Sequence, residues 1–243
     1  MERSVYDRMN ELEATHWWFV SRRSIIAALI ERHLTPPRKG IRILEAGCGS
    51  GGNLQILGRF GQVDAFEYDG GARDHAVAKS GLDIRFGALP DELPFEDRRY
   101  DLIGLFDVLE HVEADSASLA ALADRLNPDG KILVTVPAFP FLWSRHDERH
   151  HHFCRYTSAS LAQAARQAGL KVSYSTYFNS FLFPLAVTAR AMKRLTGRDT
   201  PDDTLPPAWL NATLRRIFEF EKRLLPAIRF PVGLSLAAIL EKA

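Results

Sequence analysis

Residues 43–52 read Ile-Leu-Glu-Ala-Gly-Cys-Gly-Ser-Gly-Gly, a short apolar run followed by a carboxylate and closely spaced glycines. Gly47, Gly49 and Gly52 fit the pattern G-x-G-x-x-G, whose glycines let the backbone turn sharply and lie close to a ligand. Glu67 comes twenty residues after Gly47, where an acid binds ribose hydroxyls in dinucleotide-binding proteins. The stretch therefore predicts a bound nucleoside.

Glu45 discriminates between candidate ligands because it lies two residues before the first glycine. A pyrophosphate would be repelled by this carboxylate in a partly desolvated site, whereas an ammonium or a sulfonium would be attracted. The loop lacks the Gly-Lys-Ser/Thr of nucleoside triphosphatases, and no Tyr-x-x-x-Lys pair for hydride transfer follows. We therefore favour S-adenosylmethionine over a nicotinamide dinucleotide, with its ribose near Glu67 and its methionyl amine near Glu45.

His111 is the candidate general base for methyl transfer. The reaction asks mainly for in-line positioning of the acceptor and, where needed, removal of its proton. His111 follows a strand predicted at 101–106, at the edge that would face the cofactor, and the intrinsic pKa of imidazole suits proton abstraction near neutrality. The alternative is that His111 only anchors the helix that follows.

Short β-type runs alternate with helical patterns, which is typical of a parallel sheet covered on both faces. The chain has 243 residues, of which 46% are hydrophobic, enough for one large core. We expect a single α/β domain over 1–243, with an N-terminal helical cap over 1–38 and a helical insertion over 179–230 before the final strand. The predicted strands are 41–45, 62–66, 84–86, 101–106, 131–136, 171–178 and 233–240.

Net charge and cysteine content limit the classes of partner that the sequence can be expected to have. The net charge is +1, from 31 basic and 30 acidic residues, so no whole-molecule field attracts nucleic acid, and no nucleic-acid module is visible. Cys48 and Cys154 are too few for a disulfide framework and lack metal-ligand spacing. The N-terminus shows no secretory signal pattern. We expect a cytoplasmic protein, with peripheral attachment to a membrane left open.

Four segments resemble motifs of the class I S-adenosylmethionine-dependent methyltransferases, in the same order and at the right intervals. They are ILEAGCGSG, VDAFEYD, LPDELPFEDRRYDLIGLFDVLEHV and LNPDGKILVTVP. The resemblance implies a Rossmann-like, mostly parallel sheet of seven strands with an antiparallel last strand and helices on both faces. S-adenosylhomocysteine would be the product. The implied cofactor contacts are Glu45, Gly47, Cys48, Gly49, Gly51, Asn53, Glu67, Tyr68, Ala88, Leu89, Phe106 and Asp107.

The sequence departs from the family pattern at Ala88 and Leu89, where many relatives carry an aspartate for the adenine amine. Backbone groups or Asp91 are the substitutes here. The segment Asp107-x-x-Glu110-His111 also resembles the acid-x-x-acid-His arrangement of metal-dependent relatives. A divalent metal held by these three residues and a loop histidine, His146, is the alternative mechanism.

Two further segments resemble a bacterial subgroup of the family. EATHWWFVSRRSII, near the start, carries the His-Trp-Trp-Phe motif, and HDERHHHFCRYTSASL follows the fifth strand. Cys154 replaces the first arginine of the subgroup's Arg-Arg-Tyr, which weakens the case for an arginine pair on an anionic acceptor. Arg22 is expected to face the ligand entrance. The implied acceptor residues are Trp17, Trp18, Arg22, His152 and Arg155, and Tyr156 and His146 join His111 as catalytic candidates.

The insertion over 179–230 is the expected source of acceptor specificity. Its apolar stripe predicts core packing or a dimer contact. The alternative is a membrane surface, reached by Phe181, Phe183 and Leu185 together with Lys193, Arg194 and Arg198, which would present a lipid-linked acceptor. The leading hypothesis is thus a monomeric or homodimeric methyltransferase acting on oxygen or nitrogen of a small or lipid-linked metabolite. A catalytically silent cofactor-binding partner protein is the rival.

Overall fold

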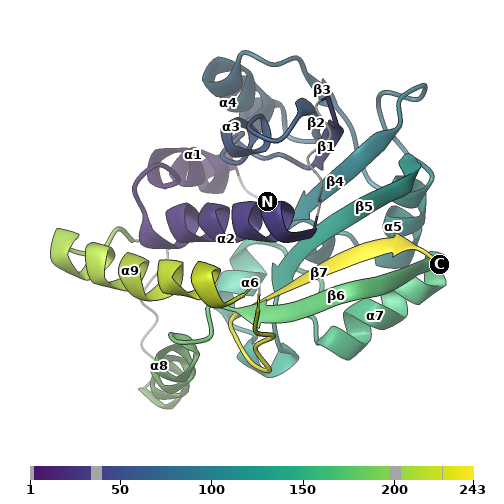
Figure 1. The fold of residues 1–243 in the computed structure, drawn as a ribbon. Helices are drawn as coiled ribbons and strands as arrows, with labels where there is room; N and C mark the ends of the chain where they lie inside the picture. The colour runs from purple at the N-terminus through teal and green to yellow at the C-terminus, as the bar shows by residue number, and fades with distance from the viewer. Residues whose placement is uncertain (1–2, 34–39, 197–203, 226) are drawn as a thin grey trace.

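The computed structural model describes residues 3–33, 40–196, 204–225 and 227–243. Its centre is a seven-stranded sheet in the order β3-β2-β1-β4-β5-β7-β6, in which β7 runs antiparallel to both of its neighbours (Figure 1). The Rossmann-like sheet with an antiparallel last strand is confirmed. The strands are β1 Arg42–Ala46, β2 Gln62–Glu67, β3 Ile84–Phe86, β4 Tyr100–Phe106, β5 Leu126–Pro137, β6 Leu170–Phe178 and β7 Ser235–Lys242.

Helices cover both faces of the sheet. On one face α2 and α9 pack on a buried cluster that includes Ile25, Phe178 and Phe218, and on the other α5 and α7 pack on a cluster that includes Leu119 and Leu161. The helices are α1 Arg3–Leu12, α2 Trp17–His33, α3 Leu54–Leu57, α4 Gly70–Ser80, α5 Asp115–Ala123, α6 Arg145–Arg149, α7 Ser158–Gln167, α8 Phe183–Thr196 and α9 Ala208–Leu224, with short 3-10 turns η1 Leu109–His111 and η2 Pro140–Leu142.

The parallel register brings the ends of neighbouring strands to one edge. Glu45 of β1 is level with Gly104 of β4, and Phe106 is level with Thr135 of β5. Because the carboxyl ends of parallel strands share an edge, residues far apart in the chain meet there. This edge carries the candidate site.

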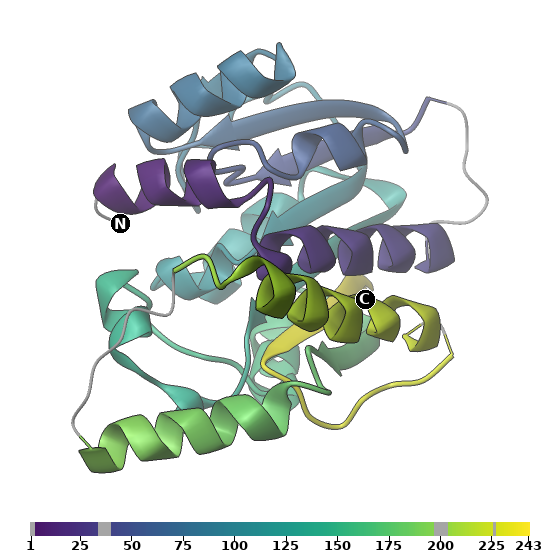
Figure 2. The same cartoon turned by 90° about the vertical axis from the view of Figure 1, so that its left-hand side faces the viewer.

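The N-terminal cap and the insertion form one helical layer. Helices α2 and α9 lie side by side in both views (Figure 2). The backbone N–H of Trp17 donates to the side chain of Asn211 at 2.9 Å, and the ring of buried Phe218 lies 5.9 Å from that of Trp17. The core-packing interpretation of α9 is therefore confirmed. Helix α1 was not expected from the sequence.

The outer surface of the insertion is less buried. Leu185 and Met192 of α8 and Trp209 of α9 are exposed. The basic residues expected to accompany them lie outside the described part, since neither the side chains of Lys193 and Arg194 nor any atom of Arg198 is described. Within the described ranges, no helix combines the length and apolar character needed to cross a bilayer.

Three boundaries differ from the sequence-based expectation. β5 begins at Leu126 instead of Lys131, because Leu126 already pairs with Tyr100 and the intervening turn residues form an irregularity before Leu102 pairs with Lys131. The final strand ends at Lys242, where it still pairs with Leu170. The sequence also predicts a helix after Ser50, and the structure has only the single turn Leu54–Leu57 there.

Candidate active site

The glycine loop between β1 and α3 has three residues in left-handed backbone conformation. The φ angles of Gly47, Gly49 and Gly51 are 71°, 54° and 84°. The N–H of Gly47 donates to the Phe66 carbonyl of β2 at 3.0 Å, which ties the loop to the neighbouring strand. A Cβ at position 47 would press on the Val108 side chain. Glycine is therefore required both for the turn and for the close approach of η1.

Glu45 lies under this loop and is 1% exposed. One carboxylate oxygen accepts a hydrogen bond from the Asn53 side chain at 2.7 Å, and the other is buried without a hydrogen-bond partner among the described residues. Burial raises the pKa of Glu45 to about 8, although Asn53 opposes the shift. A cation brought to the free oxygen would stabilise the charged form, so the site fits a methionyl ammonium.

Glu67 ends β2 and fastens the loop from the other side. Its carboxylate accepts hydrogen bonds from the N–H of Gly49 at 2.8 Å and the N–H of Asp69 at 3.0 Å. Burial raises the pKa of Glu67, and these hydrogen bonds oppose the shift. Each carboxylate oxygen can accept a second donor, which leaves capacity for ribose hydroxyls.

Tyr68 and Ala88 lie at the rim where the nucleoside is expected. Tyr68 is 69% exposed, with its ring centroid 5.8 Å from that of Phe86, so it offers a face to a stacked base. Ala88 exchanges two backbone hydrogen bonds with Glu92, and Leu89 precedes Pro90 in a turn. Cys48, by contrast, is a buried thiol whose pKa is raised by burial, which makes it a packing residue.

Arg22 is not at an open entrance, contrary to our expectation. It is 6% exposed, and its guanidinium lies 2.6 Å from a carboxylate oxygen of Asp107. The Thr135 hydroxyl donates to the other oxygen of Asp107 at 3.3 Å. The guanidinium also lies over the rings of Trp18 and Phe106. A buried cation needs a carboxylate partner, which explains why α2 reaches across to the end of β4.

Asp107 and His146 do not join the expected metal group. Asp107 is paired with Arg22, and the His146 ring lies 4.0 Å from that of His150. The group that does form consists of Glu110, His111 and His152, whose possible ligand atoms all lie within 4.8 Å of one another. The loop histidine in the group is therefore His152, because the backbone of this loop is bound to η1 through a hydrogen bond from the Phe153 N–H to the Glu110 carbonyl at 2.7 Å.

The pKa values in this group differ from the intrinsic ones. Burial lowers the pKa of His111 to about 3, and the nearby His152, with its ring centroid 4.6 Å away, adds to the shift. Burial raises the pKa of Glu110, and the charge of Asp107 adds to that shift. The expectation that His111 would titrate near neutrality is therefore wrong, since a desolvated imidazole disfavours its charged form.

Asp147 holds the loop in place, and sequence reasoning missed it. It is fully buried and accepts hydrogen bonds from His152 at 2.9 Å and from the Arg155 Nε at 2.7 Å. Burial alone would raise its pKa, but the His152 and Arg155 hydrogen bonds lower it well below the ordinary value. The Nη1 of Arg155 also donates to the Ala138 carbonyl at 3.1 Å. Both of these Arg155 donors therefore bind groups of the protein and do not face an open acceptor site. The His-Asp pair in the loop sequence was the available signal.

Tyr156 lies in the hydrophobic core and is 2% exposed. Its hydroxyl donates to Asp115, at the start of α5, at 3.1 Å. Burial raises the pKa of Tyr156 above its ordinary value. A structural role accounts for these contacts. Trp17 and Trp18 are half-buried beside the α2–α9 core, with Trp18 covering Arg22.

This fold and site define a methyltransferase, and the comparisons agree. A family model described as "Methyltransferase domain" matches residues 17–175, well over half of the chain, and the protein therefore belongs to this family of S-adenosylmethionine-dependent methyltransferases. A curated relative, the ubiquinone biosynthesis O-methyltransferase of Bordetella avium, is 26% identical over 202 residues, covering 71% of this chain and 82% of the relative.

Solved structures confirm the fold. A chain from the complex of the Haloferax volcanii Trm112 methyltransferase activator with a methyltransferase superposes with a TM-score of 0.62 at 19% identity, over 98% of this chain and 94% of that one. The [4+2]-cyclase SpnF superposes with a TM-score of 0.57 at 17% identity, over 93% and 82% of the two chains. The same fold thus supports a different chemistry in SpnF, and function must be argued from the site.

Proposed function

We propose that this enzyme transfers the methyl group of S-adenosylmethionine to an oxygen or nitrogen of a small or lipid-linked acceptor. The observation that carries the proposal is the buried Glu45 oxygen without a partner, placed directly beneath a glycine loop that Glu67 holds open to a nucleoside. The bound cofactor supplies an electrophilic methyl group. Glu45 binds its ammonium, Glu67 its ribose hydroxyls, and Tyr68 flanks its adenine.

His111 is proposed to take the proton of the acceptor as the new bond forms. It follows β4 at the edge where the cofactor's sulfur is expected. Burial lowers its pKa, which keeps the imidazole neutral but makes it a weaker base. A weak base suffices because the acceptor's proton becomes strongly acidic as the bond to the methyl group forms. His152 lies beside His111 with one ring nitrogen held by Asp147, so a proton on His111 has a neighbouring acceptor. Arg22 and Thr135 hold Asp107 at the floor of the site.

Calorimetry with S-adenosylmethionine and S-adenosylhomocysteine tests the proposal. Binding of both at micromolar concentration or below is expected, and absence of binding by either would end the methyltransferase assignment. A cofactor-binding protein that has lost its chemistry would bind both yet methylate nothing among the compounds that co-purify with it. The rival function is thereby distinguished from failure of cofactor binding.

Oxygen is the favoured methyl acceptor atom, because the relative from Bordetella avium is an O-methyltransferase of ubiquinone biosynthesis. Mass spectrometry of ligands that co-purify with the protein, followed by methylation with labelled cofactor, would identify the acceptor. Transfer of label to nitrogen alone would contradict this preference.

A metal-assisted O-methyltransferase is the second candidate, favoured by one observation. Glu110, His111 and His152 converge, the free Glu110 oxygen has no hydrogen-bond partner in the described part of the chain, and Asp147 orients His152 as carboxylates orient metal-bound histidines. A divalent ion there would lower the pKa of an acceptor hydroxyl. Activity that survives chelation and is not raised by Zn²⁺, Mn²⁺ or Mg²⁺ would rule this candidate out.

A further inference from the structure

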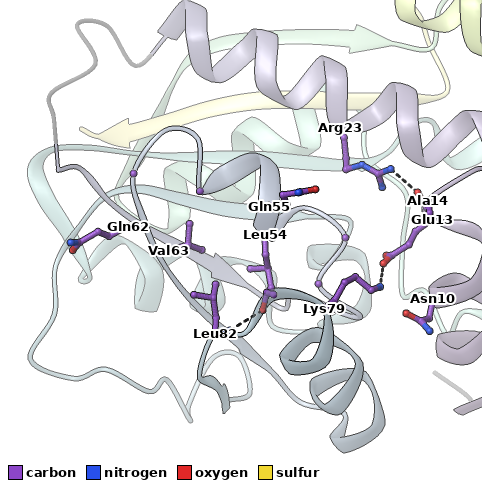
Figure 3. Close-up of a pocket in the computed structure, with 15 residues that line it drawn as sticks. Asn10, Glu13, Ala14, Arg23, Leu54, Gln55, Gln62, Val63, Lys79 and Leu82 are labelled. Atoms are coloured by element: carbon purple, nitrogen blue, oxygen red, sulfur yellow. Dashed lines mark hydrogen bonds and ion pairs between the residues drawn. The ribbon is translucent and has the colours of Figure 1, made fainter.

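The N-terminal segment contacts the back of the glycine loop through one buried carboxylate. Glu13, which follows α1, is 7% exposed, and its carboxylate accepts a hydrogen bond from the Ser50 hydroxyl at 2.9 Å. The same carboxylate forms an ion pair with Lys79 at the end of α4, and Figure 3 shows the two side chains pointing toward each other. Nothing in the cofactor chemistry described above uses Glu13.

The Glu13 carboxylate also packs against Gly52 of the glycine loop. Gly52 lacks the positive φ of Gly47, Gly49 and Gly51, so the turn itself does not require glycine there. A Cβ at this position would overlap the Glu13 carboxylate. A side chain at position 52 would therefore displace the Glu13 carboxylate from its contact with the loop.

The backbone around Glu13 is also held. The Arg23 guanidinium of α2 donates to the Glu13 carbonyl at 2.6 Å (Figure 3). A cavity of about 800 Å³ is lined by Asn10 and Glu13 of the N-terminal segment, Gln55 of α3 and Lys79 of α4. Glu13 contacts the glycine loop beside this cavity. Three residues later His16 begins the aromatic segment whose Trp18 covers Arg22.

We propose that Glu13 is a positioning residue that sets the shape of the glycine loop through Ser50 and so links the order of the N-terminal segment to occupancy of the cofactor site. The proposal rests on the proposed function for the identity of the ligand. A loop that is already fixed can bind the cofactor through its N–H groups without first losing conformational entropy. Loss of the Glu13–Ser50 hydrogen bond should therefore appear mainly as weaker cofactor binding. A bound cofactor should in turn protect the N-terminal segment.

The test compares Glu13→Ala, Glu13→Gln and Ser50→Ala with the control Glu11→Gln, which changes an exposed residue of α1 that pairs with Arg8. Glu13→Ala and Ser50→Ala are each expected to weaken S-adenosylhomocysteine binding about tenfold, the effect of one lost charged hydrogen bond. Glu13→Gln keeps an acceptor for Ser50 and should recover most of the affinity. The double variant Glu13→Ala/Ser50→Ala should bind S-adenosylhomocysteine no more weakly than either single variant, because each substitution removes the same hydrogen bond.

Three other readouts separate positioning from general stability. The KM for S-adenosylmethionine should rise about tenfold in Glu13→Ala while kcat stays within about twofold. Hydrogen exchange at residues 47–55 should rise in this variant without ligand, and the cofactor should protect residues 7–20 in the wild-type enzyme only. Unchanged affinity and unchanged loop exchange in Glu13→Ala would overturn the proposal. If the wild-type protein binds no cofactor, the proposed function fails, and loop exchange still decides the role of Glu13.

Discussion

The cofactor side and the acceptor side of the carboxyl edge are built in different ways. On the cofactor side Glu45, Asn53 and Glu67 lie within 23 residues of one another and are joined by hydrogen bonds to one loop. On the acceptor side Glu110 and His111 depend on His152, which a loop some forty residues later must deliver. Local sequence therefore specifies the first region, whereas the second exists only after Asp147 and Arg155 have folded the loop.

His111→Ala should have the largest effect of these variants, and it should change turnover without changing cofactor binding. Removal of a general base typically lowers turnover by about 10²–10⁴, and S-adenosylhomocysteine affinity should be unchanged because His111 is not among the residues proposed to hold the cofactor. Steady-state kinetics and calorimetry measure the two quantities. His75→Ala, on the outer helix α4, is the matched control. Equal turnover in both variants would remove His111 from the mechanism.

Phe218→Ala should lower the free energy of unfolding by about 3–5 kcal/mol, because a fully buried ring is replaced by a cavity. Trp209→Ala in the same helix should change it by less than about 0.5 kcal/mol, since Trp209 is 71% exposed. Chemical denaturation measures both. A large loss for Trp209→Ala would show that a partner or a second copy covers this end of α9.

Gly47→Ala and Gly49→Ala sharpen the comparison on the cofactor side. Both positions have positive φ, but an added Cβ meets Val108 at position 47 and open space at position 49. Backbone strain alone should cost about 1–3 kcal/mol in each variant, and Gly47→Ala should lose more because η1 must also move. Thermal unfolding and cofactor titration check the order. Equal losses would mean that strain dominates.

The pH dependence of binding should reveal Glu45. Its pKa of about 8 lies above the ordinary 4.5, so the folded enzyme without ligand keeps this carboxyl protonated at pH 7. A bound ammonium favours the carboxylate, so cofactor binding should release a proton, and affinity should rise as pH increases toward 8. Calorimetry in buffers of different ionisation enthalpy measures this release. Glu45→Gln should abolish it and weaken binding about tenfold.

The same raised pKa has a consequence for stability. Between about pH 4.5 and pH 8 the unfolded chain has lost the proton of Glu45 while the folded chain retains it, so the free energy of unfolding contributed by this group falls as pH rises. Denaturation of the ligand-free enzyme across this range should show a flatter decline in Glu45→Gln than in the wild type.

Most of the sheet could be predicted from the sequence, because its strands are continuous apolar runs bounded by glycines and turns. The error at Leu126 arose because Leu126 pairs with Tyr100 of β4, and the turn residues 127–130 form an irregularity before Lys131 pairs with Leu102. Helix α1 lies within the expected N-terminal cap but was not predicted as a separate helix, although Val5, Met9 and Leu12 recur at helical spacing. The positions of the glycine loop and of Glu45 and Glu67 could be predicted because each lies at a strand end, and their binding of a cofactor stays a prediction.

The acceptor side was predicted less well for a physical reason. His146 is the loop histidine that the sequence predicts for a metal group, yet His152, which Asp147 binds, lies beside Glu110 and His111. Arg22 is expected at the ligand entrance, but it is buried and paired with Asp107. Tyr156 is a catalytic candidate by sequence, and its hydroxyl donates to Asp115 at the start of α5. Each of these contacts joins side chains that are distant in the chain.

By itself the amino-acid sequence determined the class of fold, the cationic nucleoside cofactor and the acids proposed to bind it, because hydrophobic periodicity and a glycine loop act over short distances along the chain. Only the tertiary structure decided which histidine meets Glu110, which side chain packs against Gly52 and where the charge of Arg22 is neutralised. Those outcomes depend on burial and on pairing between remote side chains, and no local pattern encodes either.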